Sequence, residues 1–409
     1  MGVASERLPL AAAMIVRDEE ATLARAIQSV APVVSQLVVV DTGSGDGTVE
    51  LARSLGAEVY RVRWTDDFAA ARNEALVRVG QPWVLVLDAD EELVADDVPT
   101  LARAVKSPVA AGYNLRVVSL VGSGREFTDA RVTRLFRVGP TIRYRGRIHE
   151  QVADSLIAAG GRLAPLDVRL LHTGYLPAVM AAKHKQARNL ALLTRAAGEE
   201  PDQPYWQFQL GQTLLALGRV DEARTAYAAS AARLAPTAPL APVVAAAAIR
   251  AAVAAEDWAA ADGLARAGVA SHPSYTDLYW LRGLVLLHRD RLDAARTCFE
   301  RCLALGPPRG YLQSELGVGT YLPKTALAEV AQKAGHGDQA LAWLLSALRD
   351  QPGRLATWMM VDVLTAGTPP DVLAQHVSLV LSAAVRQQIV SDLAGLPPRC
   401  RAALEISVV

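Results

Sequence analysis

Two aspartates stand at the end of an apolar run that has the composition of a buried strand. Residues 83–87 read Trp-Val-Leu-Val-Leu, and Asp88, Ala89, Asp90 and Glu91 follow directly. Because side chains alternate along a strand, Asp88 and Asp90 share a face at its carboxyl end, where open α/β sheets bind ligands. Two carboxylates there suit Mg²⁺ or Mn²⁺ bridging to a diphosphate. Acidic residues also mark the polar end of a strand or cap a following helix, so this pair alone does not establish a metal site.

A third aspartate, Asp41, ends another apolar run and precedes a glycine-rich turn. The turn, residues 42–47, reads Thr-Gly-Ser-Gly-Asp-Gly and leads into a helical pattern at Thr48. Glycine lets a backbone approach a ligand closely, and Asp41 can accept hydrogen bonds from a base NH or a ribose hydroxyl. The G-x-G-x-x-G spacing and the P-loop lysine are both missing, so neither NAD nor ATP is favoured. A plain turn in which Asp46 or Thr48 caps the helix is the alternative.

The elements that must hold these residues alternate between strands and helices. Apolar, β-branched runs predict strands, and apolar residues spaced by three or four predict helices. The predicted strands are 11–16, 37–40, 58–62, 83–87, 113–120, 132–136 and 168–172, and the predicted helices are 21–30, 48–55 and 68–79. This order indicates βαβ units around a largely parallel sheet, with a mixed extension after Leu101.

The second half of the chain is rich in Ala and Leu and is similar to itself with a period of about 36 residues. Small residues where two helices cross, an aromatic or Leu that fills the groove, and Pro that ends the second helix are typical of tetratricopeptide repeats. The four copies are Gly211, Ala223, Tyr227, Ser230 and Pro236; Ala248, Ala260, Leu264, Ala267 and Pro273; Gly283, Ala295, Phe299, Cys302 and Pro307; and Ala328, Ala340, Leu344, Ala347 and Pro352. A non-repeating Ala-rich bundle is the alternative.

We therefore predict four segments, with the domain boundary between Tyr175 and Tyr205. They are an α/β domain over 1–180, a helical connector over 181–204, tetratricopeptide-like repeats over 205–356 and a helical tail over 357–409.

Four motifs together carry a resemblance to a known family. They are Met14-Ile-Val-Arg-Asp-Glu-Glu20, Val39-Val-Asp-Thr-Gly-Ser-Gly-Asp-Gly-Thr48, Trp64-Thr-Asp-Asp-Phe-Ala-Ala-Ala-Arg-Asn73 and Leu87-Asp-Ala-Asp-Glu91. In order and spacing the chain resembles family-2 glycosyltransferases over residues 9–175. It looks like the subgroup that carries tetratricopeptide repeats, which is similar to the S-glycosyltransferases that modify bacteriocin peptides. The resemblance implies a GT-A fold, which is a Rossmann-like mixed sheet, a nucleotide-diphospho-sugar donor, a divalent metal and inversion at the anomeric carbon.

The resemblance also implies roles for individual residues. Asp41 would contact the base or ribose, and Asp88 with Asp90 would hold ribose, metal and diphosphate, so that the three aspartates converge around a cation. For Arg72 a salt bridge on a helix surface is the alternative. The residues implied to bind the nucleotide sugar are Val16, Arg17, Glu19, Asp41, Arg72, Asn73, Asp88 and Ala89.

A further cluster, Tyr144 to Gln151, contains His149 and Glu150. Inverting transfer needs a base that deprotonates the acceptor, and a carboxylate suits that task, so Glu150 is the predicted base. His149 could share the proton, orient the acceptor or be structural. His172, at a predicted strand end, would complete the metal shell with Asp88 and Asp90 and favours Mn²⁺, unless it is a core histidine. Three arginines would offset phosphate charge, unless they form a solvated rim: Arg131, Arg134 and Arg147.

Composition narrows the partners and the compartment. Lys plus Arg and Asp plus Glu each number 42 in 409 residues, so no net charge favours nucleic acid or an anionic membrane. Three cysteines in the second half form no disulfide framework, which predicts a reducing cytoplasm. The apolar stretch 8–16 is a strand rather than a signal core, and 240–249 falls short of the roughly 20 residues of a membrane helix.

The sequence thus predicts a metal-dependent inverting transferase that moves a hexose or N-acetylhexosamine from a UDP- or other NDP-sugar to a peptide or protein side chain. The repeats motivate the acceptor, because solenoids commonly bind extended chains. One alternative makes the acceptor a cell-envelope glycan or a lipid-linked saccharide and the repeats a means of homo-oligomerisation. Another is a non-catalytic scaffold, against which the set of three aspartates argues.

Overall fold

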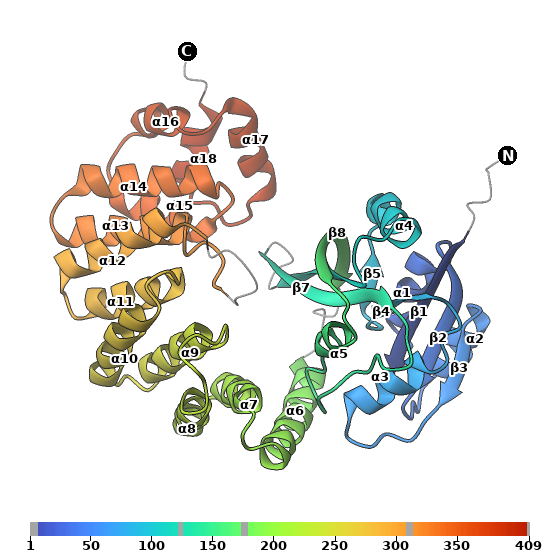
Figure 1. The fold of residues 1–409 in the computed structure, drawn as a ribbon. Coiled ribbons are helices and arrows are strands. Elements are labelled where there is room, and N and C mark those ends of the chain that lie inside the picture. Colours follow the sequence, from blue (N-terminus) through green and yellow to red (C-terminus); the bar gives the residue numbers. More distant parts are fainter. Residues whose placement is uncertain (1–6, 122–125, 173–178, 308–313, 407–409) are drawn as a thin grey trace. The chain divides into compact units, whose positions relative to one another are not determined.

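The chain divides into two compact units, residues 1–200 and 201–409. The structure is a computed structural model, and it describes residues 7–121, 126–172, 179–307 and 314–406 (Figure 1). Tyr175, one end of the predicted boundary interval, lies outside these ranges. The finer boundaries at 180, 204 and 356 stay predictions. Within the described ranges, every helix is too short or too polar to cross a membrane.

The first unit is built on an eight-stranded sheet with the order β3-β2-β1-β4-β7-β6-β8-β5. The first four strands of this order run parallel, and β7 joins β4 antiparallel. The strands are β1 Leu8–Val16, β2 Val34–Asp41, β3 Glu58–Arg61, β4 Trp83–Leu87, β5 Glu91–Leu93, β6 Gly112–Val121, β7 Glu126–Arg137 and β8 Leu163–His172. The predicted parallel sheet with a mixed extension is confirmed.

Helices cover both faces of this sheet, because side chains alternate along each strand. Leu10, Ala12 and Met14 of β1 belong to the core under α1, α2 and α4, whereas Ala13 belongs to the core under α3 and α5. The helices are α1 Leu23–Val30, α2 Thr48–Ser54, α3 Phe68–Leu76, α4 Val98–Lys106, α5 Ala153–Ala158 and α6 Val179–Glu199. The result is an α/β layered domain whose motif-bearing strand ends share one edge.

Strand β5 is the element of this unit that matters most for the site, and the sequence did not predict it. It follows β4 after three residues but pairs antiparallel with β8, at the far end of the strand order. In that pairing Glu91 stands opposite His172. The short link from β4 to β5 therefore brings residues 88–90 to the end of β8. Helices α4 and α5 were also missed.

The second unit is helical throughout its described residues. Consecutive helices from α7 to α14 contact each other as antiparallel hairpins do in repeat proteins (Figure 1). The helices are α7 Pro204–Ala216, α8 Val220–Ala231, α9 Ala241–Ala254, α10 Trp258–Ser271, α11 Thr276–His288, α12 Leu292–Leu305, α13 Tyr321–Lys333, α14 Gly337–Asp350, α15 Leu355–Leu364, α16 Pro370–Ser378, α17 Ala383–Asp392 and α18 Pro398–Glu405.

Two of the repeats pack as the sequence predicts. A Cβ atom at Gly211 would lie 2.6 Å from the ring of Tyr227, and one at Gly283 would meet the ring of Phe299 even more closely. Both rings are buried. Only glycine lets the two helices of each hairpin approach this far, so the pairing of a small residue with an aromatic ring is confirmed.

The second copy was aligned one residue too early. Leu264, predicted to fill the groove, is 41% exposed, whereas Ala265 is 0% exposed. Ala261 is likewise buried, in the place predicted for Ala260. Because nine of the fourteen residues of α10 are Ala, Gly or Ser, its sequence did not distinguish the groove position from its neighbour.

Candidate active site

A cavity of about 360 Å³ opens at the carboxyl ends of the central strands of the first unit. It brings together most of the residues that the sequence singled out. The predicted residues that line it are Val16, Arg17, Glu19, Arg72, Asp88, Ala89, Asp90, His149, Glu150 and His172. The lining residues that were not predicted are Ile15, Thr42, Trp64, Phe68, Ile148, Arg188 and Asn189.

Asp88 lies at the centre of a network of charges. Its two oxygens accept hydrogen bonds from Arg72 Nη2 at 2.5 Å and from Arg134 Nη2 at 2.7 Å. Arg72 also donates from Nε to Glu150 at 2.7 Å, and Arg134 donates to Glu91 at 2.7 Å. Burial opposes ionisation of Asp88, but the charges of Arg134 and Arg72 outweigh it and hold the pKa of Asp88 well below its usual range. Arg72 is thus a buried bridge and not a surface salt bridge.

Asp90 and His172 are in direct contact. His172 Nε2 lies 3.0 Å from Asp90 Oδ2, and the pairing of β5 with β8 accounts for this approach. Asp88 differs from them because arginines engage both of its oxygens. Among the residues that the structure describes, no group of three or more His, Cys, Asp or Glu side chains is arranged to hold a metal.

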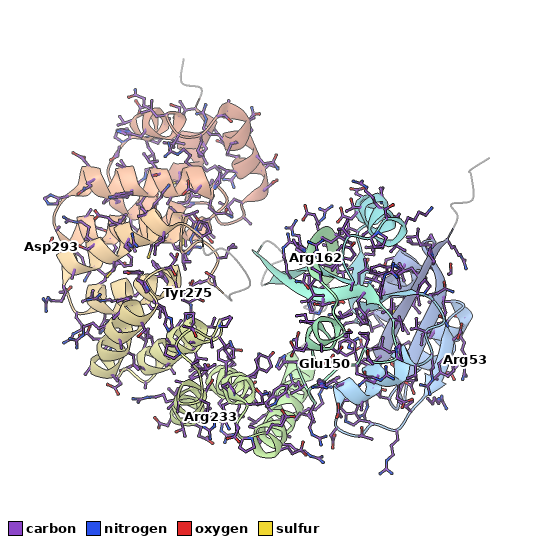
Figure 2. All side chains as sticks on the ribbon, viewed as in Figure 1. Arg53, Glu150, Arg162, Arg233, Tyr275 and Asp293 are labelled. Atoms are coloured by element: carbon purple, nitrogen blue, oxygen red, sulfur yellow. The ribbon has the colours of Figure 1, made fainter. Side chains whose placement is uncertain are left out.

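Glu150 lies on a short loop that precedes α5 (Figure 2), and His149 is the residue before it on the same loop. Arg145 and Gln151 close the loop with paired backbone hydrogen bonds of 3.0 and 2.9 Å. His149 has a positive φ of 54°, a conformation that is rare for residues other than glycine and is found most often at turns. Burial lowers the pKa of His149, against the opposing charge of Glu150. The imidazole is therefore neutral at pH 7.

Asn73 supports this loop and does not line the described cavity. Its amide nitrogen donates to the carbonyl of Tyr144 at 3.0 Å, and its side-chain oxygen accepts from the backbone NH of Tyr144 at 2.8 Å. Since both ends of the amide are engaged with the backbone, Asn73 orients the segment that carries His149 and Glu150.

Asp41 has a similar supporting position. Its side chain is buried and accepts from the backbone NH groups of Gly43 and Ser44 at 3.3 and 3.1 Å. Within the described chain the neighbouring Thr42, rather than Asp41, lines the cavity. Asp41 is therefore not among the residues that line the described cavity, and its carboxylate stabilises the glycine-rich turn. Its predicted contact with the base or ribose stays a prediction.

The glycine-rich turn is tied to the segment that carries Arg17 and Glu19. The backbone NH of Asp18 donates to Ser44 Oγ at 2.9 Å, and the backbone NH of Gly45 donates to Asp18 Oδ1 at 2.7 Å. The backbone NH of Glu19 donates to the hydroxyl of Thr48 at 2.8 Å. These bonds fix the two strand-end segments to each other at the cavity.

The three arginines that were expected to offset phosphate charge form ion pairs with carboxylates of the protein. Arg134 bonds to Asp88 and Glu91, Arg131 lies 3.7 Å from Asp167, and Arg147 bonds to Glu199 at 2.5 and 2.8 Å. In the described chain none of the three lines the cavity. That expectation is corrected: the arginines that line the cavity are Arg17, Arg72 and Arg188, and α6 supplies the last of them.

Comparisons with known proteins agree with this architecture. The model of glycosyl transferase family 2 matches residues 12–157, and the tetratricopeptide repeat model matches residues 185–239 and 246–309. A TPR repeat-containing protein of Synechococcus elongatus is 42% identical over 146 residues, which cover 36% of this chain and 36% of that protein.

Two further relatives are named glycosyltransferases. The SPbeta prophage-derived glycosyltransferase SunS of Bacillus subtilis is 24% identical over 51% of this chain and 50% of that protein. The lipopolysaccharide core biosynthesis glycosyltransferase LpsC of Rhizobium meliloti is 30% identical over 42% of this chain and 66% of that protein. The matches thus span less than two thirds of each relative. Residues 12–157 form a glycosyltransferase domain of family 2, and the same chain continues into tetratricopeptide repeats.

Proposed function

We propose that this protein transfers a sugar, with inversion, from a nucleotide-diphospho-sugar to a peptide or protein side chain. The family assignment supports the transfer reaction. The observation that carries the proposal is the cavity itself, where acidic, basic and imidazole groups from separate strand ends meet. The buried, free cysteines support a reducing cytoplasm as its setting.

The cavity has the polar groups that a sugar diphosphate requires. Arg72 lines it, and its Nη1 atom is buried without a hydrogen-bond partner among the described residues. A buried donor of this kind is costly unless something accepts from it. An oxygen of the donor substrate would supply that acceptor. We assign the nucleotide sugar to this cavity, lined by Val16, Arg17, Glu19 and Ala89, with Asp41 and Asn73 as supports of its walls.

A divalent cation fits the acidic side of the cavity. We assign Asp90 and His172 as its protein ligands, because one carboxylate and one imidazole in contact match a Mn²⁺ or Mg²⁺ ion that keeps several waters and substrate phosphates. Such an ion supplies charge neutralisation of the leaving diphosphate. Because Arg72 and Arg134 engage both oxygens of the neighbouring Asp88, we propose that Asp88 positions these arginines beside the donor substrate and is not a ligand of the cation.

Glu150 is our proposed base. Arg72 holds one oxygen of its carboxylate at 2.7 Å, which fixes the side chain at the cavity wall. The base accepts the proton of the acceptor group as the new bond to the anomeric carbon forms, and the nucleoside diphosphate leaves from the other face of the sugar. His149, neutral and adjacent, is the rival for the same proton.

The repeats offer a place for the acceptor. A cavity of about 470 Å³ in the second unit is lined by apolar side chains, among them Phe208 and Tyr227, and by the charged residues Arg250, Asp277 and Glu315. Apolar walls with a few polar groups suit a peptide segment. The similarity to LpsC favours a second candidate, in which the acceptor is a saccharide of the cell envelope.

The test is turnover of a labelled donor by the full chain. Asp90→Ala should lower turnover by about a thousandfold or more, with the circular dichroism spectrum unchanged, and EDTA should have the same effect on the unaltered protein. Donor hydrolysis that Asp90→Ala and EDTA leave intact would refute the metal site. A panel of peptide and saccharide acceptors separates the two candidate functions, since only one class should be glycosylated.

A further inference from the structure

Two arginines from distant parts of the first unit line the same cavity. Arg17 follows β1, and Arg188 lies on α6. Burial and the positive charge of Arg17 lower the pKa of Arg188, and the negative charge of Glu19 opposes them only in part. Like charges that face one cavity repel each other, so an anion between them is favoured.

The contacts that the structure describes for Arg188 do not neutralise its charge, so the guanidinium can bind an anionic ligand. In the described chain its guanidinium lies over the ring of Phe68, 5.1 Å from the ring centre, and its hydrogen bonds of 3.3 and 3.4 Å go to the Asn189 amide. Neither partner carries a negative charge. By contrast, Arg195 on the same helix donates to the carboxylate of Glu199 at 3.0 Å.

Arg17 is only loosely paired. Its Nε atom lies 3.8 Å from Asp18, and both side chains are more than half exposed. An exposed pair at this distance contributes little, so Arg17 can turn to a ligand at small cost. The cavity is therefore lined by two guanidinium groups without a strong ion pair, those of Arg17 and Arg188, together with the acidic Asp88 and Asp90. With the proposed cation on the acidic side, a ligand that meets these two guanidinium groups has several negative oxygens.

We propose that Arg188 of α6, together with Arg17, binds the diphosphate of the donor and stabilises it as the leaving group. This inference rests on the proposed function and adds to it a residue beyond the matched family 2 segment, which ends at residue 157. A planar guanidinium matches two phosphate oxygens at once. The helix that leads into the repeats then forms part of the donor site.

The experiment is calorimetric titration of the full chain in Mg²⁺ buffer. The probes are UDP, GDP and dTDP, the corresponding nucleosides, and inorganic pyrophosphate. Arg188→Ala should weaken binding of the preferred nucleotide and of pyrophosphate by about 10- to 100-fold and should leave nucleoside binding unchanged. The affinity of Arg188→Lys for the nucleotide and for pyrophosphate should fall between that of the unaltered protein and that of Arg188→Ala. Arg195→Ala, on the same helix, is the matched control and should change nothing.

Each other outcome has a distinct meaning. If Arg188→Ala and Arg188→Lys bind pyrophosphate as the unaltered protein does, or lose the nucleoside as strongly as the nucleotide, Arg188 is not a diphosphate ligand. If the unaltered protein binds no nucleotide, the proposed function fails. In that case Arg188-dependent binding of pyrophosphate would still establish the anion site, and its absence would overturn that site as well.

Discussion

The α/β unit and the repeats are stabilised by different kinds of contact. At the centre of the first, Arg72 and Arg134 are largely buried and bonded to the carboxylates of Asp88 and Glu91 and to Glu150. The core of the second is mostly apolar, and two of its hairpins pack a glycine against an aromatic ring, Gly211 against Tyr227 and Gly283 against Phe299. Charges concentrate at the cavity edge of the first unit, whereas the described repeats bury mostly apolar side chains, with Asp277 as a buried charge that is bonded to Ser314 and Arg250.

The largest expected effect is on the stability of the first unit. Arg72→Met removes the partner of Glu150 and one partner of Asp88. Because this leaves the Glu150 carboxylate, which is only 13% exposed, without its partner, we expect a loss of about 3 kcal/mol. Asp88 adds little to this loss, since its side chain is 38% exposed and keeps its bond to Arg134. Urea unfolding, monitored by hydrogen-exchange mass spectrometry, gives the free energy of unfolding of each unit separately.

The matched control lies in the repeats. Arg224 donates to Asp257 at 2.8 Å, but both side chains are more than a third exposed. Solvent screens such a pair, so Arg224→Met should cost about 0 to 1 kcal/mol. Equal losses for the two variants would remove the contrast between the units.

The second prediction concerns the base and is measured as kcat. Glu150→Gln should lower kcat by about 100-fold or more, and His149→Gln by clearly less, with nucleotide affinity as the check that the cavity is intact. The pH dependence separates the rivals. Because burial lowers the pKa of His149 below 6.5, its imidazole is neutral above that pH and becomes protonated only as the pH falls through the lowered pKa.

A histidine base would therefore give a rate that is flat above pH 6.5 and falls at lower pH. That fall should be missing in His149→Gln if His149 is the base, and Glu150→Gln should then retain both the rate and the profile. These two results would identify His149, and not Glu150, as the base, and they would leave the proposed roles of the other site residues unchanged.

The parts of the fold and site that the sequence predicts are those with local patterns. Asp88 and Asp90 follow a buried strand, and the spacing of Gly283 and Phe299 shows in the chain itself. The contact of Asp90 with His172 depends on the pairing of β5 with β8, and the two residues are 82 positions apart in the chain. Strand β5 has only three residues, which is too short for a recognisable strand pattern. Arg188 stands in an ordinary amphipathic helix, so nothing in its neighbourhood indicated a ligand.

The arginines show a second limit of prediction from sequence, because some that were predicted to bind phosphate pair with carboxylates instead. Arg131, Arg134 and Arg147 were conspicuous because they cluster in sequence. In the described chain Arg134 and Arg147 bond to carboxylates at 2.7 and 2.5 Å, and Arg131 has a loose, exposed pair with Asp167 at 3.7 Å. A charge in a sequence does not reveal whether a partner elsewhere neutralises it. Only the packed structure separates the arginines that stabilise the fold from those that remain for a ligand.

The smallest expected effect tests whether shape alone sets stability in the repeats. Alanine in place of a helical glycine gains up to about 1 kcal/mol of helix propensity, so Gly263→Ala on α10, where a Cβ meets nothing within 4 Å, should stabilise the second unit by that amount.

Gly283→Ala gains the same propensity but forces a methyl group against the ring of Phe299, which is completely buried and cannot move into solvent. Overpacking of this kind costs about 1 to 3 kcal/mol, so the net change should be a loss, seen in hydrogen exchange of α11 and α12. Nucleotide affinity should stay unchanged in both variants, because neither glycine lies in the α/β unit. If Gly283→Ala instead stabilises the repeats as Gly263→Ala does, the glycine is not what lets these helices approach, and the contrast with the charged centre of the α/β unit loses its physical basis.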